Sequence, residues 1–475
     1  MDYVFTYSRE DFEAGKLKSS EVKKLIEKHE SELVPNITKL INYYMGQQEI
    51  SSDSSKPQTV CNHAKDISDT ASGYFLGSPI SWKQVGDEET DEQFNKLTAA
   101  FDHAEVNDTD QDNALMLSIC GRAYEYVYAG EEEPELMTMP LDPLHTFIVC
   151  DESIEHKELF AVYYYYKKND VATQEDPKLY IKVFTDTEIL DWVLTSNEDK
   201  EPERTPHNCG YIPVVLYKNN KFCIGDFEQQ IGLIDAYNTL TSDRVEDKEQ
   251  FIDAILVIYG GLLGDDSESS EKAMNEVKKK KLLELDDDAK AEYLTRTLDE
   301  GGMEVLRNAL KEDIYTFSHV PNLTDKNFAG NSSGVAMEYK LLGLEMLTKI
   351  KERWYRKSLR KRLKIFLHFY GIKEVKLEET HIEAKFSRGL PKNVAEIASI
   401  VSALSGKVSQ ETLLSQIPFV ENPLQEVEAV RAENEEAIRQ QQEAFAATQN
   451  TPPEEGQEAP EEEKPKDKAK KQIDE

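Results

Sequence analysis

Apolar residues recur at helical spacing over a long stretch of this chain, from about residue 302 to residue 370. The first part of the stretch predicts a helix that ends near Pro321, because proline lacks the N–H that a helix needs. One face of this helix holds residues separated by four, four and three positions: Leu306, Leu310, Ile314 and Phe317. A polar loop rich in Gly, Asn and Ser follows as far as Gly334, and its composition suits a bend.

A second, much longer helix is predicted from Val335 to about Tyr370, where no proline intervenes. Its apolar residues recur every three or four positions: Leu341, Leu344, Leu347, Ile350 and Trp354. At roughly 1.5 Å per residue, this helix would be on the order of 50 Å long, which is more than a small domain can enclose. We therefore expect it to run through or between domains.

The rest of the chain mixes two periodicities. Helical spacing covers residues 19–46, where Pro35 can kink the helix, and also residues 91–122 and 228–258. Segments rich in Tyr, Val, Phe and Ile predict strands: Tyr124–Val127, Thr146–Val149, Leu159–Tyr166, Leu179–Phe184, Val214–Tyr217, Ala291–Leu294 and His381–Phe386. Leu282–Leu285 is also strand-like. Near the C-terminus, Gly406 suits a helix end and Ser409 a new N-cap. Together these elements predict the α+β class.

Composition limits what such a chain can be. Its 475 residues predict roughly two to four domains. The formal net charge of -35, from 91 acidic and 56 basic residues, argues against a surface that wraps a nucleic-acid backbone, although DNA can still pass by without being gripped. Five widely spaced cysteines indicate reduced core thiols in a cytosolic protein, with metal ligation as the weaker alternative. We expect a soluble protein without a cleavable signal or a membrane span.

One motif is specific enough to suggest a family. Asp325-Lys-Asn-Phe-Ala-Gly-Asn-Ser-Ser-Gly-Val-Ala-Met-Glu-Tyr-Lys340, followed by Leu342-Gly-Leu-Glu345 and a basic helical run, resembles the tunnel loop and long helix of tailed-bacteriophage portal proteins of the siphophage type. Other segments agree with this resemblance: Asn42-Tyr-Tyr-Met-Gly46, Gly73-Tyr-Phe-Leu-Gly-Ser-Pro-Ile80, Ile212-Pro-Val-Val-Leu-Tyr217, Gly225-Asp-Phe-Glu228 and Gly406–Val420. Together they cover most of the chain between about residues 42 and 423.

The resemblance implies a portal-protein fold with an α/β wing, a long-helix stem, a small α/β clip and a helical crown. In chain order, the implied segments are an N-terminal arm (1–18), the wing (19–227), a stem helix (228–259), the clip (260–300), a second stem helix (301–320), the tunnel loop (321–334), the long helix with a return strand of the wing (335–389), the crown (390–447) and an acidic tail (448–475). The composition of the tail, rich in Pro, Glu and Lys, predicts disorder.

The resemblance also assigns expected roles to charged and polar residues. The tunnel loop would line the narrowest part of a DNA channel through these residues: Asp325, Lys326, Asn327, Phe328, Asn331, Ser332 and Ser333. Lys326 and Asn327 are the expected contacts with the DNA backbone, because a cation and an amide can contact phosphates without reading bases. The 228–258 helix has a strongly acidic polar face, which in one copy is an ordinary solvated face. Repeated around a ring, it would give an anionic channel wall with these candidates: Asp235, Asp243, Glu246 and Asp247.

Residues 349–364 are strongly basic in a chain that is otherwise acidic. Nine lysines and arginines accompany one acid, Glu352. The run fits two interpretations, a footprint for nucleic acid or pairing with acidic helices of neighbouring subunits. The arginine candidates for either contact are Arg353, Arg356, Arg360 and Arg362. The four lysines at 278–281 could touch a phosphate or an acidic partner, although a solvated turn is simpler.

No catalytic or cofactor motif stands out. Gly330–Gly334 precedes a helix but lacks the lysine and the apolar strand of a phosphate-binding loop, so an ATP-driven packaging step would belong to another protein. We expect no catalytic residues, no bound metal and no cofactor. Two other classes remain as alternatives, a monomeric or dimeric helical scaffold protein and a metal-dependent nuclease that uses some of the many carboxylates.

The function implied by the resemblance is therefore structural. It is a ring of twelve copies at one vertex of a phage capsid, through which double-stranded DNA would pass during packaging and ejection. Its expected partners are the terminase packaging motor, the scaffold and major capsid proteins, and later the head–tail adaptor, with no membrane. Its expected locations are the host cytoplasm before assembly and the virion afterwards.

Overall fold

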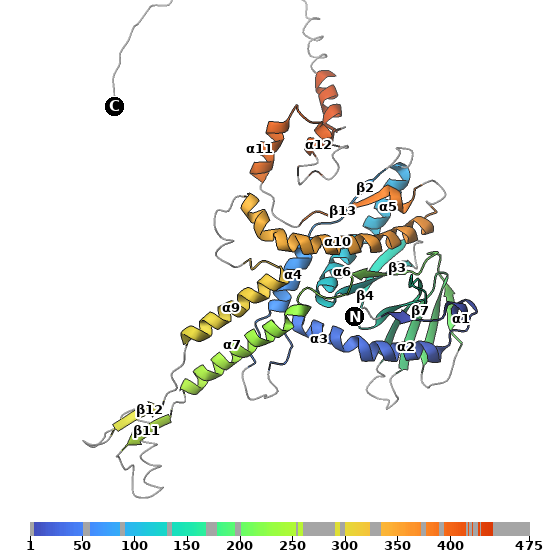
Figure 1. Ribbon diagram of the computed structural model, residues 1–475. Helices are drawn as coiled ribbons and strands as arrows, with labels where there is room; N and C mark the ends of the chain where they lie inside the picture. The colour runs from blue at the N-terminus through green and yellow to red at the C-terminus, as the bar shows by residue number, and fades with distance from the viewer. Residues whose placement is uncertain are drawn as a thin grey trace, which may run out of the picture. The chain divides into compact units, whose positions relative to one another are not determined.

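The computed structural model describes residues 4–50, 58–85, 91–130, 135–167, 178–194, 201–252, 255–259, 290–294, 300–323, 334–371, 377–388, 394–414, 417, 420, 426–427 and 429–439. The chain divides into two units, residues 1–390 and residues 391–475. The first unit contains every described strand and the helices α1 to α10, and Figure 1 shows its layers.

The main sheet of the first unit has six strands in the order β1-β5-β6-β7-β8-β9. These strands are β1 (Phe5–Thr6), β5 (Thr146–Cys150), β6 (Glu158–Lys167), β7 (Lys178–Phe184), β8 (Glu188–Leu194) and β9 (Glu203–Pro206). All neighbours are antiparallel except β1 and β5, which pair in parallel. The strands predicted at 146–149, 159–166 and 179–184 are confirmed, whereas β1, β8 and β9 were not predicted.

Two smaller sheets complete the α/β part. One has the order β10-β3-β4, from β3 (Arg122–Ala129), β4 (Leu136–Leu141) and β10 (Val214–Lys218). The other pairs β2 (Ser81–Gln84) with β13 (Ile382–Lys385), which follows a short 3-10 turn, η4 (Glu379–His381). The predicted strands at 124–127, 214–217 and 381–386 therefore exist. The β2–β13 pairing joins segments about 300 residues apart in the chain, so the chain returns to its early part after the long helix.

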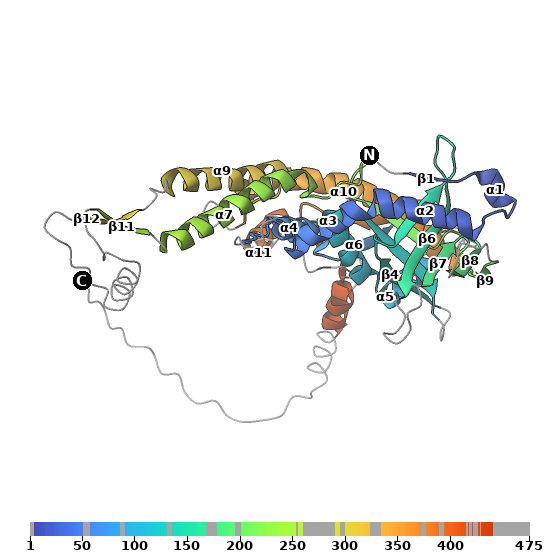
Figure 2. The same cartoon turned by 90° about the horizontal axis from the view of Figure 1, so that it is seen from below.

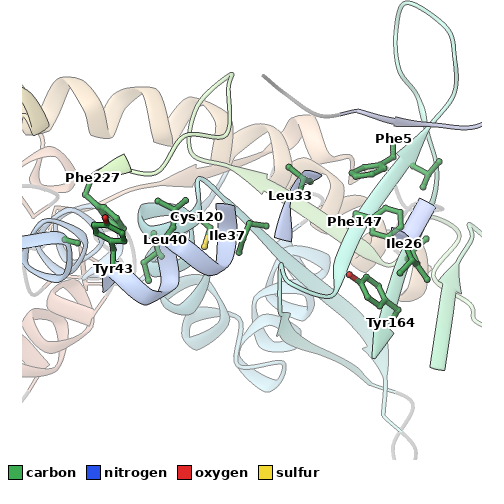
Figure 3. Close-up of a cluster of buried hydrophobic side chains, with 14 of the residues drawn as sticks. Phe5, Ile26, Leu33, Ile37, Leu40, Tyr43, Cys120, Phe147, Tyr164 and Phe227 are labelled. Carbon is green, nitrogen blue, oxygen red and sulfur yellow. The ribbon is translucent and has the colours of Figure 1, made fainter. Parts of the chain in front are cut away.

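Helices pack against one face of the main sheet. They begin with α1 (Arg9–Glu13), α2 (Ser19–Glu32), α3 (Val34–Met45) and α4 (His63–Leu76). Figure 3 shows Ile26 of α2 near Phe147 and Tyr164 of the sheet, with Ile37 and Leu40 of α3 further along the same cluster. All five side chains are buried. The apolar stripe predicted for residues 19–46 therefore builds the core.

Two predicted helices are each split in two. Residues 19–46 form α2 and α3, because Pro35 lies in the first turn of α3, where its missing N–H is tolerated. Residues 91–122 form α5 (Asp91–His103) and α6 (Val106–Cys120), and β3 takes the last residue. The break occurs at Glu105, whose φ of 51° is incompatible with a continuous right-handed helix.

The segment from 228 to 258 also differs from its prediction. After a 3-10 turn, η2 (Glu228–Gln230), the helix α7 covers Ile231–Ile252, and Ile255–Tyr259 is the strand β11. The strand β11 pairs antiparallel with β12 (Lys290–Leu294), which confirms the strand predicted at 291–294. The run Ile255–Tyr259 is short and apolar, and such a run cannot be assigned to helix or strand by periodicity alone.

The long helix is confirmed as α10 (Gly334–Phe369), preceded by α9 (Glu300–Ser318). Its buried face differs from the predicted one, because Leu341 and Leu344 are buried but Ile350 is 44% exposed. Successive steps of three residues fall short of a full 3.6-residue turn, so a stripe built from them drifts around the helix. The buried face instead continues through polar residues, Thr348 and Lys351.

The second unit is helical where it is described. It contains α11 (Val394–Leu404), α12 (Gln410–Leu414) and further helix within 429–439. Gly406 has a φ of 78°, and the Oγ of Ser409 accepts a hydrogen bond of 3.3 Å from the backbone N of Thr412. The predicted helix end and N-cap are therefore confirmed.

The core of the first unit contains a histidine that should make folding sensitive to acid. His29 is fully buried, and a 2.9 Å hydrogen bond joins its Nδ1 to the hydroxyl of Tyr164. Burial lowers the pKa of His29 to about 3, and the positive charge of Arg122 adds to the effect. The unfolded chain therefore binds a proton below about pH 6.5 that the folded chain does not bind.

We predict that this one group lowers the free energy of unfolding by about 2 kcal/mol between pH 7 and pH 5. Urea denaturation at both pH values measures the loss, and His29→Gln should reduce it, because glutamine does not titrate. The control is His156→Asn, at an exposed histidine with a left-handed φ of 47° that asparagine tolerates. An unchanged pH dependence in His29→Gln would contradict the prediction.

Candidate functional site

The candidate site is formed by three helices of the first unit, α7, α9 and α10. Figures 1 and 2 show α7 and α9 side by side, extending away from the sheets. They run antiparallel, because Arg244 near the end of α7 pairs with Glu304 near the start of α9 at 2.6 Å. At the opposite end, Nε2 of Gln230 donates a 3.1 Å hydrogen bond to the backbone oxygen of Phe317.

The two basic residues of α7 pair with α9 rather than with acids of their own helix. Arg244 pairs with Glu304, and Lys248 pairs with Glu300. The pKa values of both glutamates lie below their usual range, chiefly because of the hydrogen bonds from these two cations. The ion pairs join the two helices, and they leave the acids of α7 without compensation from these cations.

The four predicted channel-wall acids do not share one environment. Asp235 is half-buried and accepts a 2.7 Å hydrogen bond from the Tyr43 hydroxyl, so it ties α7 to α3. Asp243 is exposed, and Glu246 and Asp247 are half-buried on the following turn. The structure thus brings Asp243, Glu246 and Asp247 together on α7 and separates Asp235 from them.

The predicted loop residues lie outside the described part of the chain. This applies to the whole set: Asp325, Lys326, Asn327, Phe328, Asn331, Ser332 and Ser333. The helices on either side of the loop are described, and they approach each other at Gly343. A Cβ added to Gly343 would lie 3.4 Å from the Cβ of His319, which follows α9. The glycine of the Leu342-Gly-Leu-Glu345 motif therefore allows close contact between α10 and the end of α9.

Arg362 of α10 is fully buried in a cluster of charged residues. Its Nε lies 2.9 Å from Oε1 of Glu125 in β3, and its Nη2 lies 2.6 Å from Oδ1 of Asp110 in α6. The Tyr217 hydroxyl donates to Glu125 at 2.6 Å, and the Tyr355 hydroxyl donates to Asp110 at 2.5 Å. Burial raises the pKa of Glu125, against the opposing effect of the Arg362 charge.

This geometry corrects the prediction for Arg362. We expected it to contact DNA or a neighbouring subunit, but both of its carboxylate partners lie inside the same chain. A buried guanidinium with its donors occupied cannot reach either partner. Helical spacing could have indicated this difference, because Arg362 follows Leu359 by three positions and precedes Phe366 by four, so it lies on the apolar face of the helix.

A second buried ion pair joins α10 to the segment before α7. Lys351 pairs with Asp226, and each side chain is only 3% exposed. The other contacts of Asp226 include a 2.5 Å hydrogen bond from the Ser118 hydroxyl and a 2.9 Å bond from Nδ2 of Asn219. Asp226 therefore links α6, the β10–η2 connection and α10. It belongs to the Gly225-Asp-Phe-Glu228 motif, for which we had predicted no physical role.

A third tie involves Glu345, from the motif at the start of α10. Its carboxylate accepts hydrogen bonds from Arg388 at 2.8 Å and from the Tyr74 hydroxyl at 2.9 Å. Burial alone would raise the pKa of Glu345, but these hydrogen bonds outweigh it and hold the pKa below its usual range. Burial and the bond to Glu345 raise the pKa of Tyr74 to about 12. Three segments far apart in the chain, two of them from the motifs at 73–80 and 342–345, therefore meet at one carboxylate.

The basic run on α10 divides into paired and exposed residues. Arg356 pairs with Glu352 at 2.7 Å and donates to the backbone oxygen of Ala384. The other residues with an acidic partner in the chain are Lys349, Lys351, Lys361, Arg362 and Lys364. In the part of the chain that the structure describes, Arg353, Lys357 and Arg360 are exposed and form no ion pair. Lys357 was not among our candidates, although its spacing from Arg353 and Arg360 could have indicated it.

Other chemistry is sparse among the described residues. Over those ranges, no three His, Cys, Asp or Glu side chains form a group that could hold a metal ion. All five cysteines are free, and none is fully exposed. No helix within the same ranges is long and apolar enough to cross a bilayer.

Comparisons with known proteins agree on one family. The family model described as "Phage portal protein, SPP1 Gp6-like" matches residues 23–440. The portal protein of Bacillus phage SPP1 is 22% identical over 452 residues, which span 87% of this chain and 86% of that protein. The portal protein of Clostridium phage phiCD119 is 23% identical over 337 residues, spanning 65% of this chain and 70% of that protein. The family match includes α7, α9, α10 and the loop before α10.

Removing the charge of Arg362 should strongly destabilise the fold. We predict that Arg362→Met lowers the free energy of unfolding by about 3–5 kcal/mol, because Asp110 and Glu125 would remain buried without a cation. Arg362→Lys should lose less, since it keeps the charge. Urea denaturation followed by tryptophan fluorescence measures the loss.

The matched control for Arg362 is Arg360→Met, at an exposed arginine one half-turn away on the same helix. It should change the free energy of unfolding by no more than about 0.5 kcal/mol. Equal losses in Arg362→Met and Arg360→Met would show that the buried cluster does not hold α10 in place.

Proposed function

Because this chain belongs to the SPP1 Gp6-like family of phage portal proteins, we propose that it forms a ring at one vertex of a phage capsid. The ring is the channel through which double-stranded DNA enters during packaging and leaves during ejection. The observation that supports this function best is the family match over residues 23–440. The relatives that match most of this chain are likewise named portal proteins.

The proposed segments follow the described elements. The wing contains α2 to α6 and the strands β2 to β10 and β13, while β1 and α1 belong to the N-terminal arm. The helices α7 and α9 form the stem, and α11 and α12 belong to the crown. The clip lies between the stem helices and includes β12. The partner strand of β12 is β11, which ends just before the expected start of the clip at residue 260. The ion pairs between α7 and α9 support a stem that acts as one antiparallel hairpin.

In this arrangement, the outer face of α7 lines the channel with negative charge. Asp243, Glu246 and Asp247 support this role, since they lie together on α7 while the nearby cations pair with α9. Repeated around a ring, these carboxylates repel phosphates and let DNA slide without being held. Asp235, which is bonded to Tyr43, contributes to the joint with α3 instead.

The ring also serves as a docking site in two stages. The terminase motor binds it first and supplies the ATP-driven step, and the head–tail adaptor replaces the motor after packaging. Scaffold and major capsid proteins surround it during head assembly. We propose a structural role for this chain, with no catalytic residues.

The ring itself is the first thing to test. We predict that the purified full chain gives rings with a central channel in negative-stain electron microscopy, with a native mass near twelve chains. Particles no larger than a dimer at high protein concentration, even with the scaffold protein present, would contradict the ring. They would instead favour a non-portal helical scaffold.

The proposed loop contacts require a test in assembling phage. We predict that Lys326→Ala with Asn327→Ala lowers the DNA packaged and retained per head severalfold, because each ring loses its phosphate contacts in the narrowest part of the channel. The measurement is nuclease-resistant DNA per particle. The control is Asn95→Ala with Lys96→Ala, which removes the same two residue types from an exposed part of α5. Equal packaging in both variants would show that Lys326 and Asn327 do not contact the DNA.

A further inference from the structure

One face of α10 stays exposed along most of the helix, and its chemistry changes along its length. The N-terminal half of this face is apolar: Tyr339, Leu342, Met346 and Ile350. The C-terminal half is basic, with Arg353, Lys357 and Arg360. These residues follow one another at steps of three or four, so they share one side of the helix. We refer to these seven residues as the α10 stripe.

The α10 stripe is unusual for a surface that meets only solvent. Met346 is 62% exposed and Leu342 is 52% exposed, although neighbouring apolar residues of α10 are buried. Contiguous exposed apolar side chains indicate a surface that another molecule covers. A DNA backbone would pair with the basic half, but it offers nothing apolar to cover the other half. A protein surface that is both apolar and acidic would match both halves.

The exposed face of α9 has this composition. Val305 and Leu306 are 71% and 51% exposed, and about two helical turns further on, Glu312 is exposed and Asp313 half-buried. Phe317, at the end of the helix, is also exposed. In the described chain, neither Glu312 nor Asp313 forms an ion pair. This face of α9 therefore presents exposed apolar side chains and, next to them, acidic side chains that form no ion pair among the described residues.

The distance between the apolar and the charged residues is the same on the α10 stripe and on the exposed face of α9. On α10, the centre of Met346 and Ile350 lies seven residues before the centre of Arg353 and Lys357. On α9, Val305–Leu306 lies seven residues before Glu312–Asp313. Both separations are about 10 Å along a helix axis at 1.5 Å per residue. In a parallel alignment, apolar side chains would therefore meet apolar ones while the basic residues meet the acidic ones.

We propose that the α10 stripe of one copy docks on the exposed face of α9 in a second copy of this chain. The contact joins two different surfaces, so it is heterologous and can close into a ring. Opposite charges at the two faces favour this register over like-charged pairings in a chain of net charge -35. This inference rests on the proposed ring and identifies the residues that hold neighbouring copies together.

The test reverses the charge of the basic half in the full chain. The variant Arg353→Glu, Lys357→Glu, Arg360→Glu should raise at least tenfold the protein concentration at which half of the chains are assembled, as measured by native mass and negative-stain microscopy. The matched control makes the same change in net charge at exposed lysines on other helices: Lys24→Glu, Lys39→Glu and Lys96→Glu. The control should assemble like the wild type. Adding Glu312→Lys and Asp313→Lys to the first variant should restore assembly, because opposite charges face each other again.

A second measurement looks for the contact directly. Carbodiimide cross-linking of a mixture of ordinary and ¹⁵N-labelled chains should give mixed-isotope links between Lys357 and Glu312 or Asp313. Absence of such links in assembled wild-type rings would overturn the proposed contact and leave the ring intact.

The remaining outcomes separate the contact from the ring and from DNA. Normal rings from the charge-reversed variant would overturn the contact only. Normal rings that package less DNA would identify the basic half as a DNA surface and also overturn the contact. A wild type that stays monomeric without mixed-isotope links, even with scaffold protein, would overturn the proposed ring and the contact together.

Discussion

The position of α10 depends on the rule that a buried charge must be paired. Arg362 lies in the interior with Asp110 and Glu125, and each carboxylate also accepts a tyrosine hydroxyl. These residues come from α6, β3, β10 and α10, so the cluster is satisfied only when all four elements are in place. Burying such groups is costly, and we infer that the benefit is one definite position and rotation of the long helix against α6, β3 and β10.

Two other polar contacts of the same kind hold α10 at positions before Arg362. Glu345 meets Tyr74 and Arg388 near its start, and Lys351 meets Asp226 further along. Each tie reaches a different segment, and Tyr74, Glu345 and Asp226 belong to the short motifs that resemble portal proteins. We infer that these motifs are specific because their polar residues join segments far apart in the sequence, while apolar core positions tolerate many substitutions of similar size.

The internal ion pairs also determine which charges remain for partners. Most of the basic run on α10 is paired within the chain, and the cations of α7 are paired with α9. Asp243 of α7 is exposed, and Arg353, Lys357 and Arg360 of α10 are exposed and form no ion pair in the described part of the chain. An acidic ring wall and a basic contact between subunits are compatible roles, because they lie on different helices.

Much of the fold could be predicted from local pattern. Helical spacing predicted α9, α10 and the helical start of the chain, β-branched and aromatic runs predicted the central strands, and short motifs indicated the family. The kink expected at Pro35 became a break at Leu33, whereas the break at Glu105 and the strand β11 were missed, because backbone φ and strand pairing are decided by neighbours in space. The five strands β1, β2, β4, β8 and β9 were missed for a related reason, since edge and mixed-polarity strands depend on the sheet they join.

The properties of the candidate site also divide into those that local sequence determines and those that the tertiary structure decides. The sequence alone determined that acidic residues concentrate on α7 and basic residues on α10, since composition and spacing are local properties. Only the tertiary structure decided that Arg362 is buried while Arg360 is exposed, and that Ile350 faces outward while Lys351 faces inward. Neighbouring residues of similar type differ in burial because a helix turns about 100° at each residue. Which side of the helix is buried depends on the segments that pack against it, and these lie more than a hundred residues away in the sequence.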